Sequence, residues 1–122
     1  MPNFQTATDP SLDSVFHALA DPTRRAVIAQ LSSATEPASV SDLAKPFDMA
    51  LPSFMQHLRV LEAAGLVTTR KTGRVRTCEV QAAALATAED WIATQRAFWE
   101  GRLDRLDAYL TELQAGSDNR ED

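Results

Sequence analysis

The sequence has little of what cross-links, anchors or exports a protein. Only one of its 122 residues is a cysteine, Cys78, which excludes an internal disulfide and fits a reducing compartment. The chain contains no run of about 18 apolar residues, so no membrane-spanning helix is expected. The first ten residues show no basic segment followed by an apolar one, which argues against a secretory signal. These absences together predict a cytoplasmic protein that does not contact a membrane.

Residue types that carry enzymatic or metal chemistry are equally scarce. The sequence has two histidines, His17 and His57, and these lie with Cys78 in three different predicted elements. A zinc ion takes about four ligands, mainly from His and Cys, so no metal site is expected, with carboxylates as weak substitutes. No Gly-rich phosphate loop and no paired catalytic motif occurs. The sequence therefore predicts no catalytic residues, no enzyme activity and no cofactor.

The length of 122 residues indicates one domain, with a core over about residues 10–114 and frayed segments at 1–8 and 115–122. The share of hydrophobic residues, 44%, is ordinary for a globular protein. A chain of this length buries only a small core, which a partner subunit would enlarge.

Positive charge is in short supply and unevenly placed. The chain holds 12 Lys and Arg residues against 17 Asp and Glu residues, a net charge of −5. Residues 45–76 nevertheless hold six basic residues and two acidic ones, which leaves six basic and 15 acidic residues elsewhere. A basic patch on an acidic body draws a polyanion to one face, which suggests nucleic acid. Charge alone is equally compatible with a solvated hairpin.

Two helices are predicted at the start of the chain. Each begins at an Asp-Pro pair, at residues 9–10 and 21–22, which joins a capping side chain to a proline in the first turn. Apolar residues follow at helical spacing, namely Leu12, Val15, Phe16 and Leu19 in the first helix and the inward-facing Ala26, Val27 and Leu31 in the second. A short helix then opens at Ser39 and is limited by Pro46.

The next part of the chain predicts a helix, a hairpin and a long helix. After a four-residue turn, a helix runs over residues 51–64 and ends at Gly65. Two β-rich segments, residues 66–71 and 75–80, flank a Thr-Gly pair as in a hairpin. Helical periodicity returns over residues 83–114. A short helix, a turn, a second helix and a hairpin make a winged helix-turn-helix, so the predicted fold is mainly α with a β-hairpin wing.

The helix over residues 51–64 has a core face and an outer face at 100° per residue. The core face holds Phe54, His57, Leu58 and Leu61, with His57 at its border as a packed histidine bonded within the fold. The outer face presents Pro52, Met55, Gln56 and Arg59, with Ser53 at its edge. In a major groove, glutamine can bond adenine, arginine can bond guanine, and an apolar group can contact a thymine methyl. We therefore predict that this outer face contacts DNA, although an ordinary amphipathic helix shows the same pattern.

The predicted hairpin carries most of the basic charge. Arg70, Lys71, Arg74 and Arg76 lie on it or near its tip. Flexible cations on a projecting ribbon suit phosphates or a minor groove. We predict that these residues bind DNA, mainly through its backbone.

The last predicted helix carries an apolar stripe that is too long for a domain of this size to cover. The stripe includes Leu85, Ile92, Trp99, Leu103, Leu106 and Leu110. Exposed apolar patches of this extent mark interfaces, so we predict a homodimer that also involves Phe16. The alternative is that the helix folds back on its own subunit. Aromatic residues of the terminal helices, Trp91 and Phe98 among them, could line a pocket for a small apolar inducer or simply form the dimer core.

Four segments together resemble the ArsR/SmtB-type winged-helix repressors: "FHALADPTRRAVIAQL", "SVSDLA", "MQHLRVLEAAGLV" and "RKTGRVRTCEV". The resemblance covers roughly residues 12–113. It implies a homodimer that binds double-stranded operator DNA and leaves it when an inducer arrives. It also implies that the helix over residues 51–64 is the recognition helix and that the first and last helices form the dimer interface.

The sequence departs from the metal-sensing members of that family. Residues 39–46 contain no Cys-x-Cys pair, the last helix contains no histidine, and a thiol switch needs two cysteines. The chain instead resembles the branch without metal ligands, in which inducers are often unknown. Ala50 stands where a capping serine is usual before the recognition helix, a loss of roughly 1 kcal/mol of helix stability.

Two other functions remain open at this point. One is a winged-helix protein-interaction module without DNA binding, which the acidic body and the missing cap would suit. The other is a redox or metal sensor that uses Cys78, for instance through a link between two subunits.

Overall fold

The computed structural model describes the backbone of residues 10–121 and the side chains of residues 12–116. The predicted cap Asp9 and the predicted frayed segment 1–8 lie outside the described residues. The chain divides into two compact units, Met1–Ala88 and Glu89–Asp122, which we call the winged-helix unit and the C-terminal unit. The sequence-based prediction of a single domain stays a prediction.

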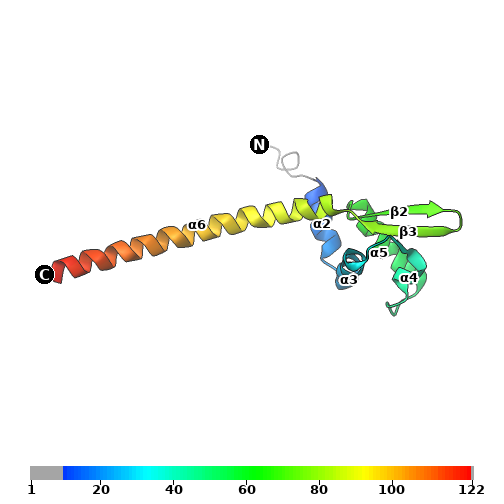
Figure 1. The fold of residues 1–122 in the computed structure, drawn as a ribbon, viewed down its shortest axis with the longest axis horizontal. Helices are drawn as coiled ribbons and strands as arrows, with labels where there is room; N and C mark the ends of the chain where they lie inside the picture. The colour runs from blue at the N-terminus through cyan, green and yellow to red at the C-terminus, as the bar shows by residue number, and fades with distance from the viewer. Residues whose placement is uncertain (1–9, 122) are drawn as a thin grey trace. The chain divides into compact units, whose positions relative to one another are not determined.

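The described part of the winged-helix unit consists of short helices and a small sheet, followed by the first turns of a long helix. Its elements in chain order are α2 (Pro10–Leu19), α3 (Pro22–Ser33), β1 (Ala38–Ser39), α4 (Val40–Ala44), α5 (Leu51–Ala63), β2 (Val67–Thr72) and β3 (Val75–Val80). The last helix, α6 (Ala82–Glu121), begins in this unit and continues through the C-terminal unit. Figure 1 shows this order along the ribbon. The predicted fold class, mainly α with a β-hairpin wing, is confirmed.

The sheet has three strands in the order β1-β3-β2, and both strand pairs are antiparallel. β2 and β3 pair in continuous register from Val67 opposite Val80 to the hairpin tip. β1 places Ala38 opposite Cys78 on the other edge of β3. The sequence does not predict β1, because two residues carry no alternation pattern and the strand forms only where β3 offers free backbone groups.

Local capping signals begin α3 and α4 as predicted. The Asp21 carboxylate accepts a hydrogen bond of 3.0 Å from the Arg24 backbone N–H, and a proline occupies the first turn of α3. The Ser39 hydroxyl accepts a hydrogen bond of 3.1 Å from the Asp42 backbone N–H. Ala50 precedes α5 and supplies no side-chain cap, also as predicted.

Two arginines close the corner between α2 and α3. Arg24 Nε donates to the Ala18 carbonyl at 2.7 Å, and Arg24 Nη2 donates to the His17 carbonyl at 3.1 Å. Arg25 Nη1 donates to the Leu19 carbonyl at 2.8 Å. The last carbonyls of a helix have no partner within it, so these bonds satisfy acceptors that α2 leaves open. The segment Asp-Pro-Thr-Arg-Arg therefore begins one helix and caps the preceding one.

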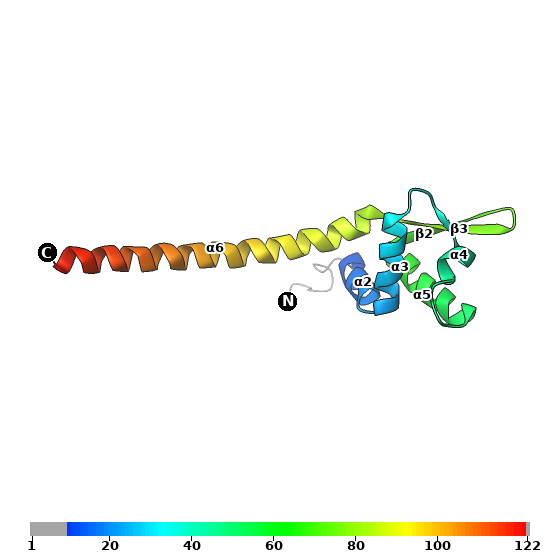
Figure 2. The ribbon, with the colours of Figure 1, turned by 60° about the horizontal axis from the view of Figure 1, so that its bottom comes forward.

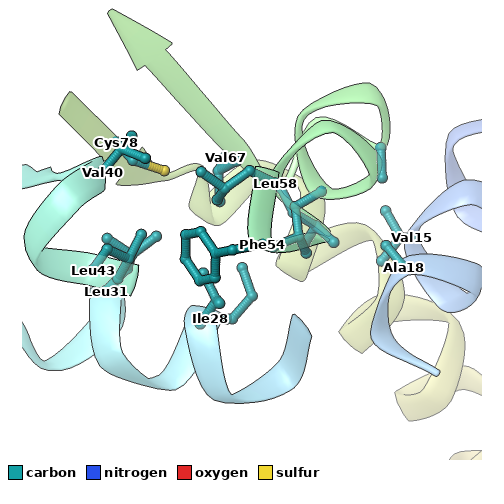
Figure 3. Close-up of a cluster of buried hydrophobic side chains, with 14 of the residues drawn as sticks. Val15, Ala18, Ile28, Leu31, Val40, Leu43, Phe54, Leu58, Val67 and Cys78 are labelled. Atoms are coloured by element: carbon teal, nitrogen blue, oxygen red, sulfur yellow. The ribbon is translucent and has the colours of Figure 1, made fainter. Parts of the chain in front are cut away.

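The core of the winged-helix unit decides which side of α5 points outward. Phe54 is fully buried and lies among side chains of α3, α4 and the sheet, including Leu43 and Val67 (Figure 3). Leu58 and Leu61 of α5 join the same cluster, and none of the buried side chains described is polar. Because this face of α5 is covered, its opposite face is held toward solvent.

Two positions predicted to face the core do not lie in it. On α3, Ala26 is exposed while Ile28 is buried beside Val27, because the larger apolar side chain gains more free energy from burial. On α5, His57 is half-buried, since its ring bonds polar groups at the edge of the core.

Two glycines form turns that need a positive φ. Gly65 ends α5 at φ 77°, and the Leu66 N–H donates to the Leu61 carbonyl at 3.0 Å while both leucines are buried. Gly73, at φ 64°, is the first residue of the two-residue loop between β2 and β3. Both turns are the predicted ones, and they set the start and the tip of the wing.

The C-terminal unit consists of α6 from Glu89 onward. Large apolar side chains are exposed along it: Trp91, Ile92, Phe98, Trp99, Leu103, Leu106, Tyr109, Leu110 and Leu113. The Arg102 guanidinium lies 5.6 Å from the centroid of the Trp99 ring. The helix continues to Glu121, past the predicted end at residue 114, and residues 115–121 contain no proline that would stop it. None of the helices in the described residues is both long and apolar enough to cross a membrane.

Candidate nucleic-acid interface

A tight turn between α4 and α5 holds the start of α5 in place. The Phe47 N–H donates to the Ala44 carbonyl and the Met49 N–H donates to the Phe47 carbonyl, both at 3.0 Å. The Phe47 ring also packs against Phe54, with 5.4 Å between the ring centroids. The two helices and this turn make the helix-turn-helix, in which Phe47 joins the end of α4 to Phe54 of α5.

The outer face of α5 is mostly polar and open to solvent. The structure places four of the predicted contact residues on this exposed face: Pro52, Ser53, Gln56 and Arg59. Met55 is half-buried, because it also packs against the core. Leu51 is exposed as well, and the sequence-based prediction did not include it. Its spacing of four residues from Met55 is a signal that would have placed it on the same face.

His57 joins α5 to the corner between α2 and α3. Its Nδ1 lies 3.3 Å from Arg24 Nη1 and 3.8 Å from Asp21 Oδ2. The hydrogen bond from the Arg24 backbone, with smaller contributions from the charges of His57 and Arg24, lowers the pKa of Asp21 from its ordinary value. The prediction of a histidine bonded within the fold is confirmed. This contact anchors the middle of α5 to the preceding helices.

The wing presents its cations to solvent. Lys71 lies opposite Arg76 and Arg70 lies opposite Thr77, while Arg74 occupies the turn, and all four basic side chains are exposed. Figure 1 and Figure 2 both show the β2–β3 hairpin extending past α4 and α5. Like charges directly opposite each other in a sheet are destabilising. An anion beside the Lys71–Arg76 pair would relieve that repulsion.

A chain of hydrogen bonds ties the wing to the last turn of α5. Glu62 Oε2 accepts from the Thr69 hydroxyl at 2.7 Å and from the Thr69 N–H at 3.1 Å. The same hydroxyl accepts from Arg76 Nη1 at 3.1 Å. These bonds set the position of both wing strands relative to α5. The sequence did not predict these hydrogen bonds. In the sequence, Glu62 is only an acidic residue within a basic segment, and no local pattern shows that its side chain reaches Thr69.

A hollow of about 540 Å³ lies between α4, the start of α5 and the wing. Its lining includes Ser39 at the cap of α4, Ser41 on α4, Leu51 and Met55 on α5, and Arg74 and Arg76 on the wing. The hollow is therefore cationic on one side and apolar on another. Such a lining suits a nucleic-acid strand, which offers phosphates next to sugars and base edges.

Comparison with known proteins identifies the family. A helix-turn-helix domain family matches residues 19–70. The HTH-type transcriptional regulator Rv2034 of Mycobacterium tuberculosis is 38% identical over 76 residues, which are 62% of this chain and 69% of that protein. The crystal structure of the ArsR family transcriptional regulator RHA00566 is 54% identical and matches 74% of this chain and 97% of its own, with a TM-score of 0.69. The chain belongs to the ArsR family of transcriptional regulators.

Two further relatives agree with this assignment. An ArsR-like transcriptional regulator from Rhodococcus sp. RHA1 is 31% identical over 80% of this chain and 90% of its own, with a TM-score of 0.66. The transcriptional repressor SdpR of Bacillus subtilis is 27% identical over 81 residues, which are 66% of this chain and 88% of that protein. The resemblance inferred from the motifs is confirmed, and the ArsR regulator described here is a DNA-binding transcriptional regulator. Its relatives are named as regulators and not as enzymes.

The predicted dimer residues of this ArsR regulator lie in both units. Phe16 is 36% exposed on α2 of the winged-helix unit. Five others are exposed on α6 in the C-terminal unit: Ile92, Trp99, Leu103, Leu106 and Leu110. Leu85 differs, because it is half-buried and packs against the core of the winged-helix unit. The first turns of α6 thus belong to that core, and the exposed stripe begins after them.

Ligands for a metal do not gather in the described part of the ArsR regulator. Among its described side chains, no group of three or more His, Cys, Asp or Glu residues could hold an ion. Cys78 on β3 is buried in the core of the winged-helix unit, and burial, with the charges of Glu62 and Glu79, raises the pKa of its thiol to about 11. At neutral pH this thiol is protonated, and the thiolate is the form that attacks disulfides or binds metals.

Proposed function

We propose that this regulator is a homodimeric repressor that binds double-stranded operator DNA through α5 and the wing. The observation that carries the proposal is the joint exposure of a polar helix face and four wing cations on a chain with a net charge of −5. Because the rest of the chain has 15 acidic residues and six basic ones, we expect DNA to be drawn to this face. The name of the relative SdpR, a transcriptional repressor, supports repression as the direction of control.

Within this interface, α5 acts as the recognition helix and the wing binds the DNA backbone. Gln56 bonds an adenine edge, Ser53 offers a hydroxyl, and Arg59 reaches a guanine or a phosphate. Arg70, Lys71, Arg74 and Arg76 contact phosphates. The hydrogen bonds between Glu62 and Thr69 hold the two sets in a fixed relation, so both engage one duplex at the same time.

Two copies of the chain pair through the apolar stripe of α6. The stripe exposes Trp99 by 61% and Leu103 by 57%, and an apolar surface of this extent is the usual mark of a protein contact. A two-fold pair would present two copies of α5, which corresponds to an operator with two inverted half-sites. Phe16 on α2 is also assigned to the contact between the two copies.

Release by a small apolar inducer is the last part of the proposal. A hollow of about 320 Å³ on the C-terminal unit is lined by Phe98, Trp99, Arg102 and Arg105. Aromatic rings beside guanidinium groups favour an apolar molecule that carries an acidic or electron-rich group. Trp91 is the other aromatic residue of this unit that is assigned to such a site. The competing explanation for these residues is the dimer core itself.

The two alternative functions have less support. A redox or metal sensor would need a reactive Cys78, and this thiol is buried with its pKa raised to about 11. A protein-interaction module without DNA binding would have no use for Gln56 and Arg59 exposed beside a cationic wing. No metal and no cofactor enters the proposal.

A mobility-shift experiment with the DNA upstream of the regulator's own gene tests the proposal. We expect a complex that survives an excess of random duplex. Equal affinity for upstream and random DNA would reject operator recognition. Sedimentation equilibrium of the free protein should give about twice 13.4 kDa, and a single-chain mass at micromolar concentration would reject the dimer.

A further inference from the structure

Two exposed apolar side chains of the winged-helix unit have no individual contact assigned to them under the proposed function. Among the described side chains of this unit, only Phe16, Leu51 and Val75 are large, apolar and exposed. Phe16 is assigned to the contact between copies. Leu51 is 56% exposed at the start of α5 and Val75 is 51% exposed beside the wing turn, and both line the hollow between α4, α5 and the wing.

Two arginines decide what kind of ligand this hollow accepts. Arg74 and Arg76 line it, and none of its lining residues is acidic. A ligand that fills it therefore combines negative charge with an apolar group at short distance. An apolar peptide would leave the positive charges of both guanidinium groups without a counter-charge in the hollow, and a free phosphate ion would leave Leu51 and Val75 uncovered. One nucleotide of a DNA strand offers negative charge on its phosphate and apolar groups on its sugar and base.

The apolar side of the hollow also favours one base. Leu51 and Met55 are four residues apart, so they lie on the same face of α5. In the major groove of B-DNA only thymine carries an apolar group, the methyl at C5, whereas the other bases present donors and acceptors. Two aliphatic side chains side by side form no hydrogen bond to those groups and gain free energy by covering a methyl.

We infer that this hollow binds one thymidine nucleotide in each operator half-site. Arg74 and Arg76 bind its phosphate, Leu51 and Met55 cover the thymine methyl, and Val75 packs against the deoxyribose. Leu51 is then a specificity-determining residue that adds thymine to the adenine read by Gln56. The inference rests on the proposed function, because it requires that α5 and the wing engage one duplex.

Replacement of single thymines by deoxyuridine tests this inference, because it removes one methyl and leaves base pairing intact. The operator is first selected by the full-length protein from random duplexes, and each thymine is then replaced in turn. We expect one thymine per half-site at which the replacement weakens binding about fourfold, the effect of one covered carbon group. For Leu51→Ala the same replacement should weaken binding only about twofold, because one of the two side chains that cover the methyl is gone.

The matched control is Thr68→Ala, which shortens another exposed side chain of the same unit, one that does not line the hollow. This variant should keep the full response to deoxyuridine. The melting temperature of Leu51→Ala should match that of the unmodified protein, since Leu51 is exposed. If the protein binds its selected operator but no thymine responds, the inference is wrong while the proposed function stands. A response in Leu51→Ala as large as that of the unmodified protein would also reject it. Failure to bind or enrich any duplex would instead reject the proposed function.

Discussion

Two exposed surfaces of this protein, one on α5 and the wing and one on α6, suit different kinds of partner. The surface on α5 and the wing is polar and cationic, so water solvates it well and only a partner with matching charges and hydrogen-bonding groups improves on water. The stripe on α6 is apolar, so water solvates it poorly and any complementary apolar surface improves on water. We therefore propose that the first surface provides specificity and the second provides association. Variants on each surface should therefore separate the two properties.

The largest effect is expected from a charge placed in the stripe. Leu106→Glu puts a carboxylate into the proposed contact between copies, where burial of an unpaired charge is costly. The dimer should be lost at micromolar concentration, and sedimentation equilibrium should give about 13.4 kDa. Operator affinity should fall by about 100-fold or more, because the two half-sites no longer act together.

Ala108→Glu is the matched control for the stripe. It adds the same charge at an exposed position two residues farther along α6, about 160° around the helix from Leu106. This variant should remain a dimer and keep its operator affinity. If both variants dissociate, general repulsion explains the result, and the stripe loses its assigned role.

A substitution on the recognition helix should change specificity without changing the mass of the assembly. Gln56 is exposed on the outer face of α5, so Gln56→Ala removes no packing. Loss of a paired contact to a base should cost about 1–3 kcal/mol at the operator and little on random DNA. Fluorescence anisotropy with both duplexes measures the difference. An unchanged preference for the operator would show that another face of α5 reads the bases.

A substitution on the wing should weaken binding to every sequence alike. Arg74→Ala removes a cation from the hairpin turn, and each lost phosphate contact reduces the salt slope of the binding constant by about 0.9. The slope should therefore become shallower by about one to two units per dimer, in a salt titration with operator and random duplexes. Arg96→Ala in the C-terminal unit is the control and should leave the slope unchanged. Equal slopes for Arg74→Ala and the unmodified protein would remove the wing from the interface.

A smaller effect is expected where the wing joins α5. Glu62→Gln keeps the shape of the side chain but replaces charged acceptor atoms that hold the Thr69 hydroxyl and N–H. Discrimination between operator and random DNA should fall about three- to tenfold, the scale of one hydrogen bond. Glu79→Gln removes the same charge from an exposed position on β3 and should keep full discrimination. If the two variants behave alike, charge explains the effect and the hydrogen bonds do not.

Metal ions and mild oxidation are expected to have no effect on operator binding. Micromolar zinc, cadmium or arsenite should leave operator binding unchanged, as should mild oxidation near neutral pH. The pKa of Cys78 is raised to about 11, so its thiol ionises only when the pH approaches that value. Mobility shifts with and without each reagent measure this. Loss of binding that one substitution at His17, His57 or Cys78 abolishes would establish a sensor instead.

Much of the fold follows from short-range signals in the sequence. The capping carboxylate of Asp21 and the positive φ of Gly65 and Gly73 involve neighbours within a few residues, so the pattern shows them directly. The outer face of α5 was also predictable, because helical periodicity separates Gln56 and Arg59 from Phe54. The candidate site was predicted less completely from the sequence. The prediction omitted Leu51 and gave no partners for the Glu62 carboxylate.

The sequence by itself determined the order of the elements, the faces of α5 and the concentration of positive charge on one segment. Only the tertiary structure decided that β1 pairs with β3, that Arg24 meets His57, and that Glu62 holds Thr69. The physical reason is range. Helix starts, turns and periodicity arise from groups a few residues apart, whose geometry the backbone itself constrains. Contacts between separate elements depend on which side chains the buried core brings together, and no local pattern carries that information.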